Sequence, residues 1–157
     1  MESENSGSMP DIEVQMMTMM VLEAFLYGLL SIILLIVGFM VLDFVVPCDF
    51  RKEIFEEKNT AVGVLAGGLF VALGLIVRSS VIGGGRGTED GMMDGLFATL
   101  VFSGTGLVLF VAGYLLLALL FRKENLHRHI DEHNTAVGFA LAGFFIAIAL
   151  AVSGSIQ

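Results

Sequence analysis

The sequence predicts an all-α integral membrane protein with four transmembrane helices, arranged as two tandem parallel repeats of a two-helix hairpin. Three observations predict this class. Hydrophobic residues make up 56 % of the 157 residues and charged residues only 15 %, a composition more apolar than a soluble domain needs. The apolar residues form four long stretches. Finally, the segment that begins with Asn59 recurs from Asn134.

Each apolar stretch is long enough to cross a bilayer. We expect the transmembrane helices over residues 21–46, 60–82, 93–121 and 135–156. At about 1.5 Å per residue, each of these spans a hydrocarbon core of about 30 Å. Transmembrane β-strands are about ten residues long and alternate apolar with polar residues. The four stretches do not alternate in this way, so their pattern favours helices.

The chain divides into four parts around these helices. Residues 1–20 form a polar, acidic N-terminal tail, 21–82 the first repeat, 83–92 a glycine-rich external loop, and 93–157 the second repeat. The tail contains no Lys or Arg, so it lacks the basic region of a cleaved signal peptide. We therefore expect the first helix to remain in the mature protein.

The distribution of basic residues predicts the orientation. Lys and Arg in short loops are retained on the cytoplasmic side of a membrane. The loops after the first and third helices share one side and hold six of the eight basic residues. These are Arg51, Lys52, Lys58, Arg122, Lys123 and Arg128. We therefore expect both of these loops in the cytoplasm and both termini outside.

The repeat can be aligned at a fixed spacing of 75 residues. Pairing residues 59–81 with 134–156 gives about eleven identities over the segment, including the polar Asn-Thr pair. An apolar composition alone does not reproduce a polar pair in register. We infer that a hairpin was duplicated in tandem. Because each hairpin crosses the membrane twice, both copies have the same orientation, and their pseudo-symmetry axis runs along the membrane normal.

The repeated polar residues are the candidate polar or ion site, at the cytoplasmic start of the second helix of each hairpin. They are Asn59, Thr60, Asn134 and Thr135. One interpretation is that Asn and Thr cap the helix by accepting hydrogen bonds from free backbone N–H groups. The other is that two related helix starts attract an anion or line a pore. Both functions can coexist.

Asp43 is the ionisable residue placed farthest into a predicted helix from the cytoplasmic end, and its counterpart in the second repeat is Ala118. We add Asp43 to the candidate polar site. A carboxylate near a helix end can reach interfacial water, or it can coordinate a proton or a cation.

Small residues recur along the second helix of each hairpin. They are Gly63, Gly67 and Gly74 in the first repeat, and Gly138, Ala142 and Ala149 in the second. Small residues let helix backbones approach closely in a membrane. We therefore expect these positions to serve helix packing.

Other reactive residues do not form a recognisable site. The spacing of His127, His129 and His133 matches no specific metal motif, so we expect a solvated, pH-sensitive loop and no metal site, with these histidines as the residues that could otherwise supply ligands. The chain has one cysteine, no carboxylate pair inside a span and no recognisable Ser-His-Asp set. We expect neither an enzyme nor a bound cofactor.

Two copies of a hairpin, each entering its second helix through "EKNTAVG" or "EHNTAVG", resemble the bacterial inner-membrane proteins of the domain of unknown function 350 family, the YjfL-like family. The most specific part is carried by Asn59 to Gly63 and by Asn134 to Gly138. The resemblance implies a four-helix integral protein of the bacterial cytoplasmic membrane. It implies no activity.

Two functions remain as expectations. The first is a structural or partner-binding component that forms homo-oligomers in the lipid bilayer, with a cytoplasmic or membrane protein as a possible partner, because glycine-rich helices offer several close-packing faces. The alternative is a channel or transporter for ions or small solutes, with its polar site at the cytoplasmic end of the repeat interface. The net charge of −8 is spread over the tail and loops, and we expect no nucleic-acid partner.

Overall fold

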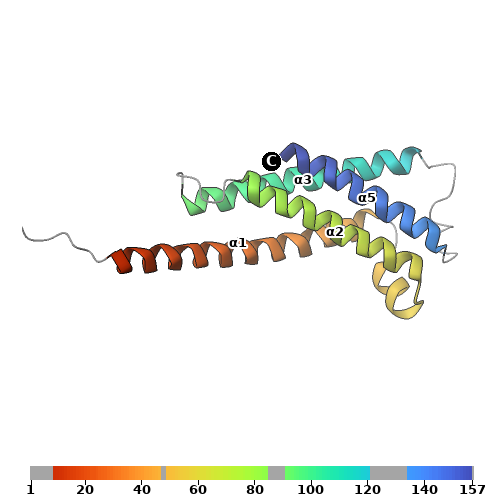
Figure 1. Ribbon diagram of the computed structural model, residues 1–157. Coiled ribbons are helices and arrows are strands. Elements are labelled where there is room, and N and C mark those ends of the chain that lie inside the picture. Colours follow the sequence, from red (N-terminus) through yellow and green to blue (C-terminus); the bar gives the residue numbers. More distant parts are fainter. Residues whose placement is uncertain (1–8, 47–48, 85–90, 121–133, 157) are drawn as a thin grey trace, which may run out of the picture.

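The computed structural model describes residues 9–46, 49–84, 91–120 and 134–156, and the regular structure in these ranges is entirely helical (Figure 1). Its elements are α1 (Met9–Val45), the short π-helix η1 (Lys52–Glu56), α2 (Thr60–Gly83), α3 (Met92–Leu120) and α5 (Thr135–Ile156). Within the described residues, four helices are long and apolar enough to cross a membrane. The prediction of a helical protein with four helices suited to cross a membrane is confirmed for these residues.

Helix α1 begins at Met9, twelve residues before the expected start at residue 21. Part of the segment expected to form a polar tail is therefore helical. Pro10 lies in the first turn, where a missing N–H costs nothing, and Asp11 suits the positive end of the helix dipole. The following residues include Met, Gln and Glu, which favour helix. As a result α1 extends well past the ends of the other helices (Figure 1).

The other three helices begin and end within one residue of the expected bounds. Helix α2 starts directly after Asn59 and ends at a pair of glycines. Beyond that end, the N–H of Gly84 donates to the carbonyl of Ser80 at 2.8 Å. Polar residues before an apolar run and glycines after it are strong helix boundaries, which explains why these bounds are visible in the sequence.

The hairpins bring four helix ends together at one end of the molecule. Helices α1 and α3 end there, and α2 and α5 begin there (Figure 1); we call this the loop-side end. Helix α2 contacts α1, α3 and α5, and its most extensive contact is with α5. It is the central helix of the bundle.

Aromatic and aliphatic side chains fill the space around α2. The ring of Phe145 on α5 lies 5.6 Å from that of Phe110 and 5.7 Å from that of Tyr114, both on α3. Leu69 and Ile76 of α2 are buried in the same cluster. The outer sides of the helices instead expose many large apolar residues, as expected of surfaces that face lipid.

Candidate polar site at the start of helix α2

Asn59 is the N-cap of α2, and its side-chain amide is bonded at both ends. Its Oδ1 accepts hydrogen bonds from the backbone N–H groups of Ala61 at 3.0 Å and Val62 at 3.4 Å. Its Nδ2 donates to Glu53 Oε2 at 3.0 Å. The residue is 2 % exposed and its backbone is extended, as usual for an N-cap. The Asn59 side chain is therefore part of the fold at this helix start.

A folded segment before Asn59 supplies this partner. Phe50 is 2 % exposed, and its ring lies 5.7 Å from the ring of Phe39 on α1. After η1 the chain reverses at Lys58, whose φ of 53° is left-handed. This reversal lets the N–H of Asn59 donate to the carbonyl of Glu53 at 2.8 Å. The first hairpin loop is thus anchored at both ends of η1.

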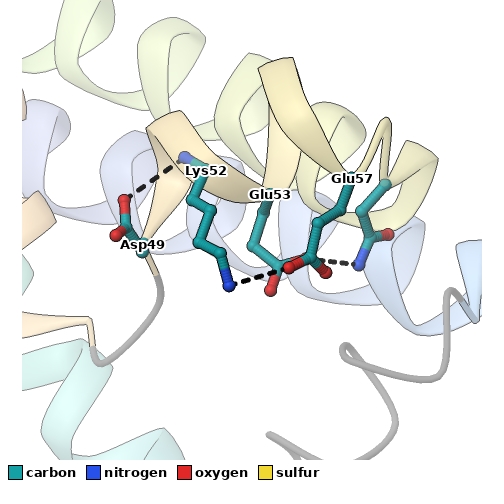
Figure 2. A network of polar contacts seen from close by, with 5 residues as sticks. Asp49, Lys52, Glu53 and Glu57 are labelled. Carbon is teal, nitrogen blue, oxygen red and sulfur yellow. Dashed lines mark hydrogen bonds and ion pairs between the residues drawn. The ribbon is translucent and has the colours of Figure 1, made fainter.

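Charged side chains of η1 and its flanking residues, among them Asp49, Lys52, Glu53 and Glu57, take part in polar contacts (Figure 2). Lys52 Nζ lies 2.9 Å from Glu57 Oε1, and Asp49 Oδ1 accepts a hydrogen bond from the backbone N–H of Lys52 at 3.3 Å. The hydrogen bond and charge of Glu57 raise the pKa of the Lys52 ammonium above its ordinary value of 10.5. Because both side chains are well exposed to water, this pair contributes little to stability.

The matching helix start of α5 is built differently. The side chain of Asn134 is exposed and that of Thr135 is half-buried, whereas Thr60 is exposed. The backbone carbonyl of Asn134 accepts from the N–H groups of Val137 at 3.0 Å and Gly138 at 3.2 Å. The two asparagines therefore occupy different environments, one buried and one open to its surroundings.

The two helix starts nevertheless lie side by side. A Cβ atom added to Gly138 would lie 2.5 Å from the carbonyl oxygen of Ala61.

Asp43 is exposed near the end of α1, where its neighbour Phe44 is 92 % exposed. A carboxylate so close to a helix end can reach interfacial water, and its role as an ion ligand stays a prediction.

The small residues expected to pack divide into two groups. Gly138, Ala142 and Ala149 on α5 are buried. On α2, a Cβ atom added to Gly63, Gly67 or Gly74 would meet no atom within 4 Å. Gly63, Gly67 and Gly74 therefore make no close helix contact within one chain, and Gly74 instead lines a groove between α1 and α2.

Two residues that support the candidate site, Glu53 and Phe50, do not stand out in the sequence. Their signal is short: Phe50 and Ile54 are spaced one helical turn apart and turn inward, while Arg51 and Phe55 are exposed. One turn is too little to stand out by periodicity.

The described residues do not include the candidate metal ligands His127, His129 and His133. Within the described part, no metal-binding group of His, Cys, Asp and Glu occurs.

Comparison with known proteins agrees with this membrane architecture. The chain is 25 % identical to a UPF0719 transmembrane protein of Mycolicibacterium paratuberculosis over 124 residues, which are 78 % of this chain and 79 % of that protein. It is also 25 % identical to a UPF0719 transmembrane protein of Aquifex aeolicus over 138 residues, which are 85 % of this chain but 50 % of that protein.

No solved structure matches the chain. The family model described as Domain of Unknown Function (DUF350) matches residues 16–156. That description names no activity, and the relatives are named only as transmembrane proteins. The resemblance seen in the repeated "NTAVG" segments is confirmed by a match over nearly the whole sequence, and the chain belongs to the DUF350 family.

Proposed function

We propose that this protein is a structural component of the bacterial cytoplasmic membrane that assembles with copies of itself, with its loop-side end in the cytoplasm. The observation that carries the proposal is that the Asn59 side chain is buried and hydrogen-bonded at both ends of its amide. The most specific polar residue of the repeat is 2 % exposed, and its amide is bonded to two backbone N–H groups and to Glu53. A side chain so engaged stabilises a helix start.

The proposal includes a tandem duplication of the hairpin, and equivalent contacts inside the two hairpins support it. The rings of Phe39 and Phe70 stack at 4.5 Å, and those of Tyr114 and Phe145, each 75 residues later, stack at 5.7 Å. A Cβ atom added to Gly38 would meet the side chain of Leu73 at 3.0 Å. The same addition at the equivalent glycine, Gly113, would meet the equivalent Ile148 at 2.9 Å.

Exposed helix surface supports self-association. In a membrane, helices associate through close packing of small residues, because lipid already solvates large apolar side chains. Helix α5 exposes small residues along one side, including Ala140, Gly143 and Ala147. A protein partner at the cytoplasmic face stays a prediction, and so does the channel or transporter alternative.

Counting the copies in one particle tests the proposal. The wild-type protein is extracted from membranes directly into polymer-bounded lipid nanodiscs, and particle masses are measured by native mass spectrometry. We expect particles with more than one copy. Two differently tagged versions, expressed separately and mixed after extraction, provide the control, because they yield mixed particles only if assembly follows extraction. Single copies throughout would contradict the proposal.

A further inference from the structure

Helices α2 and α5 contact each other through different sides of the repeated sequence. On α5, the side in contact carries Gly138, Ala142, Phe145 and Ala149, all buried; we call it the Gly138 side. On α2 it carries Ala61, Leu65, Gly68 and Ala72, also buried; we call it the Gly68 side. A Cβ atom added to Gly68 would lie 2.5 Å from Cβ of Ala142. The chain thus contains one tight contact between two unlike sides.

Because the sequences of the two helices repeat at a spacing of 75 residues, α2 also carries a counterpart of the Gly138 side. Likewise, α5 carries a counterpart of the Gly68 side. On α2, the equivalent of the Gly138 side is formed by Gly63, Gly67, Phe70 and Gly74. On α5, the equivalent of the Gly68 side is formed by Ala136, Ala140, Gly143 and Ala147. Because Gly63 and Ala61 are two residues apart, the two sides of a helix point in nearly opposite directions at 3.6 residues per turn.

Both equivalent sides are uncovered in one chain, fully on α5 and in part on α2, where Gly63 and Gly74 are half-buried. All four small residues on the α5 side are exposed, and a Cβ atom added to Gly143 would meet nothing within 4 Å. On the α2 side, the space around Gly63 and Gly67 is equally open, and Phe70 is 43 % exposed. Phe70 stacks on Phe39 of its own hairpin, as Phe145 stacks on Tyr114, so this side of α2 has the same local surroundings as the side already in contact on α5.

We infer that copies of this chain join head to tail, the uncovered side of α2 in one copy packing on the uncovered side of α5 in the next. The inference rests on the proposed self-assembly and names its surface. A second copy is the fitting occupant because the two uncovered sides are the two halves of a contact that the chain already makes internally. Such an interface joins unlike surfaces, so it closes into a ring when the rotation between copies allows.

The internal contact fixes the register between copies. Gly68 against Ala142 within a chain corresponds to Gly143 of one copy against Gly67 of the next. Likewise, Ala61 against Gly138 corresponds to Ala136 against Gly63. Each of these pairs joins α2 of one copy to α5 of another. A two-fold symmetric interface formed by one of these helices alone would instead pair α2 with α2 or α5 with α5, and would therefore bring different residues together.

Disulfide crosslinking in native membranes tests this register. In a Cys48→Ser background, one tagged copy carries Gly67→Cys and a differently tagged copy carries Gly143→Cys. We expect crosslinked dimers when the two are coexpressed and none when either is expressed alone. Ala112→Cys, an exposed position on α3, replaces Gly143→Cys as the control and should give none. Crosslinking of either variant with itself, or no crosslinking of the mixture, would overturn the inference.

Gly143→Leu provides a second test that does not depend on crosslinking. Leucine at this open position should leave the thermal stability of the single chain unchanged and should reduce the nanodisc particles to one copy. Gly104→Leu, on an exposed part of α3 that is equally free of neighbours within 4 Å, should keep the wild-type copy number. Unchanged copy number in Gly143→Leu would overturn the inference.

The two tests separate this inference from the proposed function. If wild-type nanodiscs hold one copy, self-assembly and the inferred interface are both wrong. If they hold several copies but residues 67 and 143 do not crosslink, assembly stands and only the interface is wrong.

Discussion

Asn59 and Asn134 occupy the same place in the repeated sequence but differ in environment. Asn59 is buried and bonded to Glu53, because the residues before it fold back as η1 and carry the Glu53 carboxylate to its amide. Asn134 is exposed. A residue type and its spacing predict a helix cap, but the strength of that cap depends on what the preceding segment places beside it.

Replacing the two asparagines separately should therefore have unequal effects. Asn59→Ala removes the cap of α2 and leaves Glu53 without its amide donor, so we expect a loss of about 1–2 kcal/mol in the free energy of unfolding. Asn134→Ala should cost less. Unfolding in mixed micelles of increasing SDS content measures both variants. Equal losses would contradict the distinction between the buried, bonded Asn59 and the exposed Asn134.

The ion pair beside η1 gives a prediction about pH. The hydrogen bond and charge of Glu57 raise the pKa of Lys52 above 10.5 in the folded chain. The small stabilisation from this pair is therefore fully present below pH 10.5 and is lost as the pH rises through the folded pKa. Glu57→Gln should lower the Lys52 pKa, measured by NMR titration of a lysine-labelled sample.

Glu56→Gln is the matched control for this titration, because Glu56 acts on Lys52 only through a weaker charge effect. It should lower the Lys52 pKa less than Glu57→Gln does. A Lys52 pKa that is the same in the Glu57→Gln variant and in the wild type would show that the pair does not form in solution.

At the scale of elements, the contact between α2 and α5 depends on which of two equivalent glycines faces the other helix. Gly138 approaches the backbone of Ala61, whereas its counterpart Gly63 is open. Helices with small residues at their contact approach closely in a membrane, and a larger side chain at the contact forces them apart. The same residue type therefore has different consequences at two positions of one repeat.

We expect Gly138→Leu to lower the free energy of unfolding by about 1–3 kcal/mol or more, because an added side chain meets the rigid backbone of Ala61. Gly63→Leu should leave the stability of a single chain nearly unchanged, since the space there is free. The same SDS titration, at a protein concentration that keeps the chains monomeric, compares the two. A Gly138→Leu variant as stable as Gly63→Leu would contradict the packing of α2 on α5.

The elements differ in how far the sequence predicts them. The bounds of α2, α3 and α5 follow from apolar runs with polar or glycine residues at their ends, and they agree with the structure within one residue. Helix α1 begins twelve residues before the expected transmembrane segment, because hydropathy marks where a helix enters the membrane and not where its hydrogen bonding begins. The turn η1 is too short for its periodicity to be recognised.

The candidate site was predictable only in part. The repeated Asn-Thr pair correctly located both helix starts, because capping is a local property of a residue and the turn after it. The burial of Asn59, its bond to Glu53 and the openness of Gly63 depend on tertiary packing. A sequence repeat predicts similar helices, but it does not say which side of each helix finds a partner.

At the scale of the whole molecule, the arrangement of the hairpins means that the membrane side of one end determines the orientation of all four helices. Helices α1 and α3 end at the loop-side end, where α2 and α5 begin, and α2 and α5 end at the opposite end (Figure 1). The excess of Lys and Arg in the sequences that join these helix ends predicts that the loop-side end is cytoplasmic. One labelled position on each side is therefore enough to test the orientation of the whole chain.

Cys48, the only cysteine of the sequence, lies between α1 and η1 and provides the first label. In spheroplasts, a membrane-impermeant maleimide should modify Cys48 only after permeabilisation. In a Cys48→Ser background, Ser155→Cys near the end of α5 should react without permeabilisation. The reverse pattern would place the termini in the cytoplasm and would contradict the proposed orientation.

The most direct test of the central claim, that the repeated polar residues serve structure and not conduction, is ion and proton flux through proteoliposomes containing the purified protein. The Asn59→Leu/Asn134→Leu double variant is measured beside the wild type. We predict that flux through wild-type vesicles equals that through protein-free vesicles for a broad set of ions. Wild-type flux that the double variant abolishes, while folding and assembly persist, would contradict the account and make the two asparagines part of a conduction path.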